Sequence, residues 1–257
     1  MASPAPAGSR VVYGVNPVRE LVLARAAQIN VVYFTAGASG PGLSALREIC
    51  RNRGVSTADR DVTAIESLAG KGARHQGVVA LAGEYAYANL DDLLIVPAAS
   101  SAGEAAKQPL LLVLDGIQDP QNLGAIVRCA DALGANGVVI PKDRAAQVTA
   151  AVVKASAGAT EHVRIAQVTN LARTIDKLRE RGLWAIGAVA QGGQPPTEVD
   201  LTAAIILVLG SEGRGLRHLI QRSCDLTVQI PMVGMVSSLN VAVTAGILLY
   251  EARRQRK

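Results

Sequence analysis

The sequence predicts an α/β protein in which a parallel sheet covered by helices follows a smaller α/β domain. Over residues 110–254, buried-strand patterns alternate with helical ones, an order typical of parallel strands joined by helices. A stretch rich in Ala, Ser and Pro at residues 85–108 separates that region from an earlier alternation. The chain has 257 residues, of which 49% are hydrophobic, so it can bury a sizeable core and is not intrinsically disordered.

We therefore expect a small domain at residues 10–84, a linker at residues 85–108 and a larger domain at residues 109–257. In the small domain, helix-like and strand-like patterns alternate through VVYGVNPVRELVLARA, INVVYFTAG, GLSALREICRNRG, VSTADR, VTAIESLAG and GVVALAGEY.

The larger domain begins with a buried strand and an amphipathic helix. LLLVLDG at residues 110–116 is a continuous apolar run, and NLGAIVRCADALG at residues 122–134 carries apolar residues at helical spacing. Asp119 and Pro120 suit the N-cap and the first position of that helix. Further strands are expected at residues 137–141, 163–168, 183–190, 204–210 and 226–231, and further helices at residues 147–159, 170–182, 215–224 and 238–254.

The last of these helices, residues 238–254, is apolar nearly all round. A helix of this kind must be buried on several sides. The pattern alone slightly favours a central core helix over a dimer interface, and it leaves both open.

Composition excludes several classes of protein. A net charge of +5 permits a polyanionic partner without requiring one. Three cysteines and three histidines are scattered without metal-ligand or disulfide-framework spacing, so we expect no metal. No apolar run reaches the roughly 20 residues of a membrane span, and MASPAPAGSR does not resemble a secretory signal. We expect a cytoplasmic protein that contacts no membrane.

Three loops follow predicted strands, where open α/β folds bind their ligands. The first leads into a helix carrying Asn122, Gly124 and Arg128. The second, residues 210–216, is rich in glycine, which lets the backbone approach a ligand closely, although it matches no nucleotide-binding fingerprint. The third, residues 230–240, holds two of the three methionines and ends in serine N-cap candidates.

Each loop also has an ordinary interpretation. Arg128 can be a solvated residue paired with Asp131, the second loop can be a plain glycine-rich turn, and the third can simply cap a helix with Asn240 solvated in its first turn.

The order of the three motifs is more specific than any one of them. N-x-G-x-x-x-R, L-G-S-E-G-x-G and I-P-M-x-G-x-V-S-S-L-N-V-A together resemble the three motifs of the SpoU/TrmH (SPOUT) family of RNA 2′-O-ribose methyltransferases.

The resemblance covers about residues 110–256 and implies a fold, a cofactor and an assembly. It implies a methyltransferase domain with a deep trefoil knot, S-adenosylmethionine bound at the knot, and a homodimer. By position, the implied cofactor-binding residues are Gly210, Ile230 and Leu239, with Leu209, Met235 and Ser238 as neighbours and Glu212, which also matches a catalytic residue, beside them.

The residues matching the catalytic and substrate-positioning ones are Asn122, Arg128, Glu212 and Asn240. In the family, the residue corresponding to Arg128 is proposed to take the proton of the hydroxyl. A guanidinium has a pKa above roughly 12, so a cation that holds a phosphate and stabilises the developing alkoxide suits its chemistry better.

The small domain resembles the family's L7Ae/L30-like substrate-binding module through YGVNPV at residues 13–18 and RHQGV at residues 74–78. This implies an RNA-binding domain, although His75 alone suits a polar surface or turn residue better than an RNA contact. Several basic side chains of the domain could contact phosphates or could simply be solvated: Arg47, Arg51, Arg53, Arg60, Lys71 and Arg74.

The resemblance implies methyl transfer from S-adenosylmethionine to the ribose 2′-hydroxyl of a nucleotide, a guanosine, in 23S rRNA. The alternatives are the same chemistry on tRNA or at an antibiotic-resistance site of rRNA, and a non-catalytic RNA-binding or ribosome-assembly factor. A Rossmann dehydrogenase is remote because G-x-G-x-x-G is missing.

Overall fold

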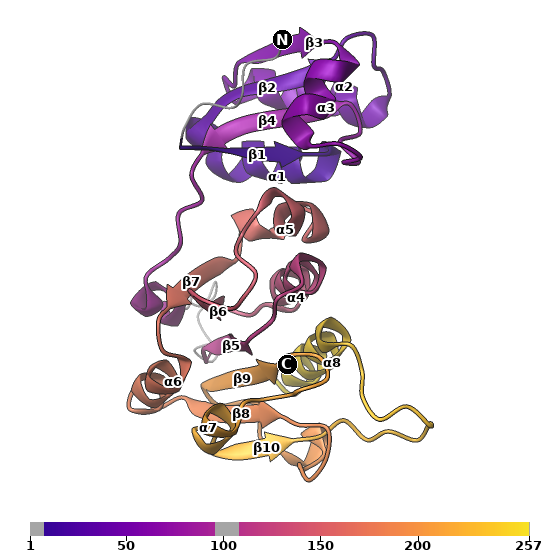
Figure 1. The fold of residues 1–257 in the computed structure, drawn as a ribbon. Helices are drawn as coiled ribbons and strands as arrows, with labels where there is room; N and C mark the ends of the chain where they lie inside the picture. Colours follow the sequence, from indigo (N-terminus) through magenta and orange to yellow (C-terminus); the bar gives the residue numbers. More distant parts are fainter. Residues whose placement is uncertain (1–7, 96–107, 257) are drawn as a thin grey trace. The chain divides into compact units, whose positions relative to one another are not determined.

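A computed structural model describes residues 8–95 and 108–256, which divide into two compact units (Figure 1). Unit 1 comprises Met1–Ala86 and Val148–His162, and unit 2 comprises Tyr87–Gln147 and Val163–Lys257. The contacts therefore assign residues 148–162 to unit 1, whereas the sequence division placed them in the larger domain. Of the expected linker, residues 96–107 lie outside the described residues, and Leu90–Leu94 forms a 3₁₀ helix, η2, whose Leu93 is buried in the core of unit 2.

Unit 1 contains a four-stranded mixed sheet in the order β1-β4-β2-β3. The two pairs that involve β4 are antiparallel, and β2 pairs with β3 in parallel. Contacts place α1 beside α2, whereas α3 contacts β1, β2 and β4. The elements from the N-terminal part are β1 Ser9–Tyr13, α1 Val15–Arg25, β2 Ile29–Thr35, α2 Pro41–Asn52, β3 Thr57–Arg60, α3 Val62–Ala69 and β4 Val78–Gly83, with a 3₁₀ turn η1 at Ala26–Gln28.

The second segment of unit 1 adds α5 (Ala150–Ala155) and a 3₁₀ turn, η3 (Ala159–Glu161). Val153 of α5 is buried in the core of this unit; α5 contacts β1, and η3 contacts α1. At Gly158 the backbone φ is +96°, and a Cβ there would overlap Glu20 and Pro17, so a glycine is required for α1 to approach. The single helix predicted for residues 147–159 is thus shorter, because the chain turns into η3 against α1.

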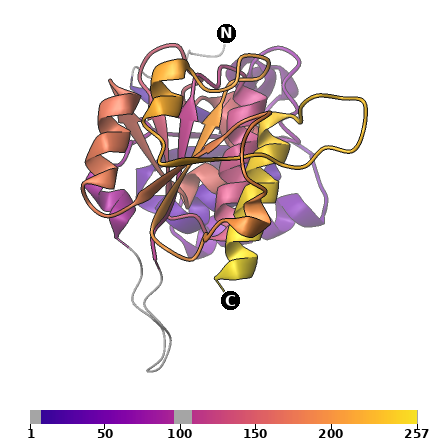
Figure 2. The ribbon, with the colours of Figure 1, turned by 90° about the horizontal axis from the view of Figure 1, so that it is seen from below.

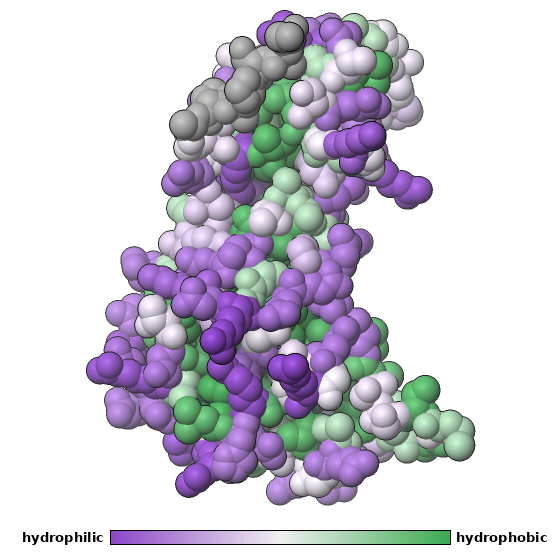
Figure 3. Space-filling model, in the orientation of Figure 1, coloured by the Kyte–Doolittle hydropathy of each residue, from purple (hydrophilic) through white to green (hydrophobic). Residues whose placement is uncertain are grey.

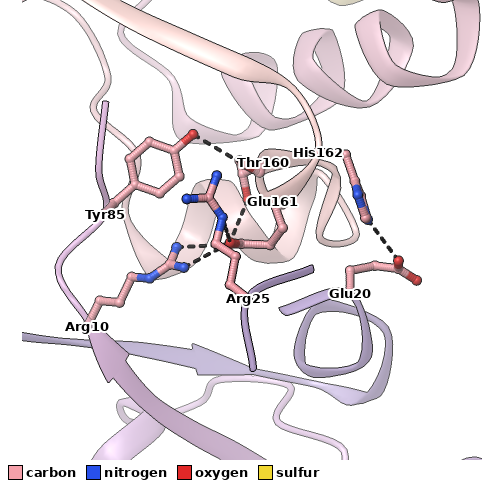
Figure 4. Close-up of polar contacts among 7 residues, drawn as sticks. All are labelled: Arg10, Glu20, Arg25, Tyr85, Thr160, Glu161 and His162. Atoms are coloured by element: carbon pink, nitrogen blue, oxygen red, sulfur yellow. Dashed lines mark hydrogen bonds and ion pairs between the residues drawn. The ribbon is translucent and has the colours of Figure 1, made fainter. Parts of the chain in front are cut away.

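A buried carboxylate fixes this second segment (Figure 4). The Glu161 side chain is fully buried and forms ion pairs with Arg10 of β1 and with Arg25 at the end of α1. Both guanidinium groups lie over the ring of Tyr85, whose hydroxyl donates to the carbonyl of Thr160 at 3.1 Å. Since a buried charge is tolerated only when it is paired, these contacts specify one position for residues 159–161.

Unit 2 is built on a six-stranded sheet, all parallel, in the order β10-β8-β9-β5-β6-β7. Its central strands are continuous apolar runs because helices cover both faces. The strands are β5 Leu110–Asp115, β6 Gly137–Pro141, β7 Arg164–Val168, β8 Trp184–Ala188, β9 Ile205–Gly210 and β10 Leu226–Val228. The strands expected from the sequence are all present, and the predicted α/β class is confirmed.

Two pairs of helices cover this sheet (Figure 2), and a 3₁₀ turn, η4, at Pro196–Glu198 contacts α8. On one face, α6 (Leu171–Arg179), α7 (His218–Arg222) and η2 contribute buried apolar residues to one cluster. On the other face, α4 (Pro120–Leu133) and α8 (Val241–Gln255) pack against each other. None of the helices within the described ranges is both long enough and apolar enough to cross a membrane.

The ends of α4 are as the sequence predicts. The Asp119 carboxylate accepts a hydrogen bond from the backbone N–H of Gln121, Pro120 is the first residue of the helix, and Gly134 ends it with φ +79°. The start of α8 differs from the expectation of about residue 238. The helix begins at Val241, and the side chain of Asn240, rather than a serine, caps it.

One face of α8 is buried, and the other is exposed. Ala245, Leu248 and Leu249 are fully buried in unit 2, whereas Ile247 and Tyr250 are 39% and 61% exposed. The core interpretation is therefore confirmed for the buried face, whereas the dimer-interface interpretation stays a prediction for the face that is apolar and exposed.

Candidate functional site

The polar residues of the three unusual loops meet at the carboxyl edge of the unit 2 sheet. Strands β5 and β9 are adjacent, and their last residues, Asp115 and Gly210, are paired in register. The loops that follow these two strands, together with residues 230–240 before α8, therefore lie next to one another, as expected at this edge of an open α/β sheet.

Asn240 is the centre of the site. Its Oδ1 accepts hydrogen bonds from the backbone N–H groups of Ala242 and Val243, at 2.9 and 3.4 Å. Because the side-chain oxygen faces the helix, the side-chain Nδ2 of Asn240 points away from it. Nδ2 donates to Asn122 Oδ1 at 2.9 Å and to Glu212 Oε1. The capping role therefore fixes the orientation of the amide, and the amide brings together residues from three distant parts of the chain.

Three of the four residues expected to be catalytic or substrate-positioning thus form one cluster: Asn122, Glu212 and Asn240. Arg128 is not part of it. Arg128 lies on the exposed side of α4 and forms no hydrogen bond or ion pair with any described residue, Asp131 included.

A second polar pair lies beside this cluster and was not predicted. Asp115 ends the buried strand β5 and is 1% exposed. Its carboxylate accepts from the backbone N–H of Arg217 at 2.9 Å and from Arg217 Nε at 2.7 Å. The sequence signal was a carboxylate at the end of an otherwise apolar strand, since such a group must find a partner where it is buried. The pair anchors the end of the glycine-rich loop to β5.

The glycine-rich loop is a tight turn rather than an open flap. The backbone N–H of Gly215 donates to the carbonyl of Ser211 at 2.9 Å, and Gly213 has a φ of +78°. A Cβ on Gly210 would overlap the backbone of Gly215 and Leu216. Gly210 is therefore required for the turn to fold back on the end of β9.

A cavity of about 490 Å³ lies between this turn and the loop before α8. It is lined by five of the six residues expected to bind the cofactor: Leu209, Gly210, Ile230, Ser238 and Leu239. The sixth, Met235, does not line the cavity, and its side chain is fully exposed.

The residues that line this cavity fit S-adenosylmethionine. Leu209, Ile230 and Leu239 offer an apolar surface for an adenine ring, and two serine hydroxyls, Ser237 and Ser238, offer polar partners. The carboxylate of Glu212 also lines the cavity and suits a sulfonium cation.

A second cavity, of about 1030 Å³, lies on the other side of the cluster. The two cavities share Ser211, Glu212, Gly215 and Val241. Asn122 lines only the larger cavity and Asn240 only the smaller, so the hydrogen bond between them marks the boundary. Two adjoining cavities that meet at one carboxylate and two amides can hold two reactants side by side.

Comparison with known proteins agrees with this geometry. Residues 109–250 match the model of the SpoU rRNA Methylase family, and residues 11–88 match the model for RNA 2′-O ribose methyltransferase substrate binding. The fold and the paired cavities define an RNA methyltransferase that uses S-adenosylmethionine. The chain belongs to the SpoU rRNA Methylase family.

Individual relatives cover most of the chain. It is 39% identical over 246 residues to the 23S rRNA (guanosine-2′-O-)-methyltransferase RlmB of Pseudomonas putida, covering 96% of both chains. It is 48% identical over 183 residues to the putative TrmH family tRNA/rRNA methyltransferase YacO of Bacillus subtilis, covering 71% of this chain and 72% of the relative. The crystal structure of the SpoU methyltransferase AviRb from Streptomyces viridochromogenes, in complex with AdoMet, superposes with a TM-score of 0.80 at 27% identity, over 97% of this chain and 91% of that one.

Proposed function

We propose that the chain transfers a methyl group from S-adenosylmethionine to the ribose 2′-hydroxyl of a guanosine in 23S rRNA. The observation that carries the proposal is the hydrogen bonding of Asn240 to Asn122 and Glu212, at the junction of the two cavities. The relatives named as 23S rRNA guanosine methyltransferases support the substrate.

S-adenosylmethionine supplies an activated methyl group on a sulfonium, which is a good leaving group. The protein's task is therefore to align the ribose hydroxyl oxygen with the methyl carbon. As the O–CH3 bond forms, the S–CH3 bond breaks with its electrons remaining on a neutral thioether, and the hydroxyl proton passes to water. Asn240 holds Glu212 in one orientation where the cavities meet, and Asn122 extends this polar surface into the larger cavity. We assign the smaller cavity to the cofactor and the larger one to the nucleotide.

Arg128 is proposed to provide the cation that binds the adjacent phosphate and stabilises the developing alkoxide. A guanidinium keeps its proton at neutral pH, so this role suits it better than that of a general base. Since Arg128 lies outside both cavities of its own chain, we propose that it acts in the site of a second copy.

A homodimer is proposed on the same grounds. On the exposed side of α8, Val243, Ile247 and Tyr250 are apolar. The loop between β10 and α8, which projects at the lower right of Figure 3, is also largely hydrophobic. A large exposed apolar surface of this kind marks an interface. We expect the partner to cover these residues: Val233, Met235, Val236, Val243, Ile247 and Tyr250.

Unit 1 is proposed to bind the RNA. Of the six basic candidates, Arg47 is occupied by an ion pair with Asp59 and lies over the Phe34 ring, and Arg60 lies over the ring of Tyr33. The remaining four are exposed, make no side-chain hydrogen bond or ion pair within the described part of the chain, and suit phosphate contacts: Arg51, Arg53, Lys71 and Arg74. His75 takes the ordinary role, since its Nδ1 accepts from the Gly77 N–H within the turn. We propose that the protein works in the cytoplasm, where the rRNA is made.

The deciding experiment uses the purified chain, isotope-labelled S-adenosylmethionine and unmodified 23S rRNA transcribed in vitro, followed by nucleoside mass spectrometry. We expect labelled 2′-O-methylguanosine, and none with the Asn240→Ala variant. Label on tRNA but not on rRNA would assign a different substrate. Cofactor binding without transfer to any RNA would contradict the proposed activity.

A further inference from the structure

Four carboxylates reach the larger cavity, and three of them are occupied. Asp115 is held by Arg217, Asp119 caps α4 through Gln121, and Glu212 accepts from Asn240. The fourth is Asp143, in the loop after β6. It is exposed and forms no hydrogen bond or ion pair with any residue in the ranges that the structure describes.

The loop that carries Asp143 is held rigidly. The two N–H groups of Gln147 Nε2 are shared among the carbonyls of Pro141, Lys142 and Ala145, at 3.1–3.2 Å, so one side-chain amide links both ends of the loop. Gln147 Oε1 accepts from Tyr87 and from Gln167, which fixes the amide's orientation.

The same loop is also attached to the rest of the site. The N–H of Ala146 donates to the carbonyl of Ile117, in the loop after β5, at 2.8 Å. Asp143 is therefore presented to the cavity by a preorganised backbone rather than by a mobile one.

The neighbour of Asp143 is strained. Arg144 has a φ of +55°, a left-handed conformation that costs free energy for a residue with a Cβ. Its side chain lines the cavity together with Arg214, and neither forms a hydrogen bond or ion pair through its guanidinium within the described residues. Two free cations fit a cavity that receives an RNA phosphate.

A free carboxylate does not fit that role, because it repels the phosphate. Its presence is explained if it meets two hydrogen-bond donors. A carboxylate accepts at both of its oxygens. Among the Watson–Crick edges of the four RNA bases, only that of guanine offers two adjacent donors, N1–H and the N2 amino group. Enzymes that act on a nucleotide taken out of its stack read it through this edge.

We propose that the Asp143 carboxylate accepts hydrogen bonds from N1–H and the N2 amino group of the target guanine, and that it thereby restricts methylation to guanosine. Arg144 and Arg214 hold the adjacent phosphates in the same cavity. The inference rests on the proposed function, because it concerns the base whose ribose is methylated.

The methylated position is first located by mass-spectrometric mapping of ribonuclease fragments of the labelled 23S rRNA. The test then compares RNA fragments that carry guanosine or inosine at that position. Inosine lacks only the N2 amino group. For the wild-type protein we expect kcat/KM to fall about 10-fold or more with inosine, because one hydrogen bond to a charged group is lost. For Asp143→Asn, activity on guanosine falls by a similar factor, and the preference for guanosine over inosine falls below about threefold.

The matched control is Glu180→Gln, which makes the same charge change at the exposed end of α6 and should keep the wild-type preference. RNA Kd values are measured with both fragments alongside turnover, so an inactive variant still reports the preference. S-adenosylmethionine affinity confirms that each variant is folded.

Each outcome decides between the two proposals. Equal methylation of guanosine and inosine by the wild type would overturn the role of Asp143 and leave the proposed function intact. An unchanged preference in Asp143→Asn would also overturn it. No methylation of either fragment by the wild type would instead contradict the proposed function.

Discussion

The two carboxylate oxygens of Glu161 accept hydrogen bonds from the two terminal nitrogens of Arg10, at 2.8 Å from Nη1 and 2.9 Å from Nη2 (Figure 4). This bidentate pair joins β1 to the segment between β6 and β7, 151 residues further along the chain. With Arg25 at 3.2 Å from the same carboxylate, two cations depend on one buried anion.

Replacing Glu161 with Gln should therefore destabilise unit 1. The substitution leaves two largely buried guanidinium groups without a counter-charge, and removal of one partner of a buried pair costs about 3–5 kcal/mol. Hydrogen exchange followed by mass spectrometry should show faster exchange in residues 9–13 and 148–162. Glu66→Gln, an exposed glutamate in the same unit, should leave exchange unchanged. Unaltered exchange in Glu161→Gln would show that the pair does not stabilise the unit.

Arg128→Ala should abolish methyl transfer and leave cofactor affinity intact. Loss of one group that stabilises transition-state charge typically lowers kcat about 100-fold or more, whereas Arg128 lies outside the proposed cofactor cavity. Calorimetry with S-adenosylmethionine and turnover on rRNA measure the two effects. Arg173→Ala, on the exposed side of α6, is the control. Normal turnover would remove Arg128 from the mechanism.

The action of Arg128 in a second copy has its own test. Mixing Arg128→Ala chains with Asn240→Ala chains creates heterodimers in which one site has an intact Asn240 and faces an intact Arg128 of the partner. We expect activity to return on mixing. A mixture as inactive as its components would place Arg128 in the site of its own chain.

Gly210→Ala should weaken S-adenosylmethionine binding more than 10-fold, because its Cβ collides with the backbone of Gly215 and deforms the wall of the smaller cavity. Isothermal titration calorimetry gives the affinity. Gly234→Ala is a suitable comparison, since a Cβ there meets nothing within 4 Å and should not alter binding. If both variants bind equally well, the smaller cavity is not the cofactor site.

Ile247→Glu should separate the proposed dimer into single chains. Ile247 lies on the exposed apolar side of α8, and a buried, unpaired carboxylate in an interface is costly. Light scattering after size exclusion should give twice the chain mass of 26.6 kDa for the wild type and the single mass for the variant. Val62→Glu alters an exposed apolar residue of α3 and should remain dimeric. A wild-type protein of single mass would contradict the dimer.

The contribution of Glu251 to stability should depend on pH. Hydrogen bonds from Arg254 and Gln255 lower the pKa of Glu251 from its ordinary value of 4.5 to about 2. Because the folded-state pKa is the lower one, the stabilisation is fully present above pH 4.5 and is lost as the pH falls towards 2. Urea denaturation should show wild type more stable than Glu251→Gln at pH 7, with the difference shrinking below pH 4.5. Glu198→Gln, at an exposed carboxylate, should show no such pH-dependent difference.

Local chemistry explains which parts of the fold could be predicted. The strands of unit 2 follow from apolar runs, and the start of α4 follows from Asp119 and Pro120, because these signals depend on neighbouring residues alone. The membership of residues 148–162 could not be derived in this way. It depends on Glu161 meeting Arg10 and Arg25, which are distant in sequence.

The site shows the same division. Asn122, Glu212 and Asn240 were singled out by their motifs, and the structure brings them together. The capping role of Asn240 was missed because Ser237 and Ser238 are equally good N-cap residues by type, and only the backbone geometry chooses among the three. Asp115 and Arg217 were missed because their pairing requires the glycine-rich turn to fold back on β5.

The interleaving of Val148–His162 with the N-terminal residues sets the order of events during synthesis. The first 86 residues leave the ribosome well before Glu161 has been added to the chain. Until then, Arg10 and Arg25 have no buried counter-ion, and the surface that receives Val153 stays open to water. The N-terminal unit thus differs from domains that fold as units in the order in which they are made. Residues 148–162, which complete this unit, are synthesised only after β5, α4 and β6 of the other unit have been translated.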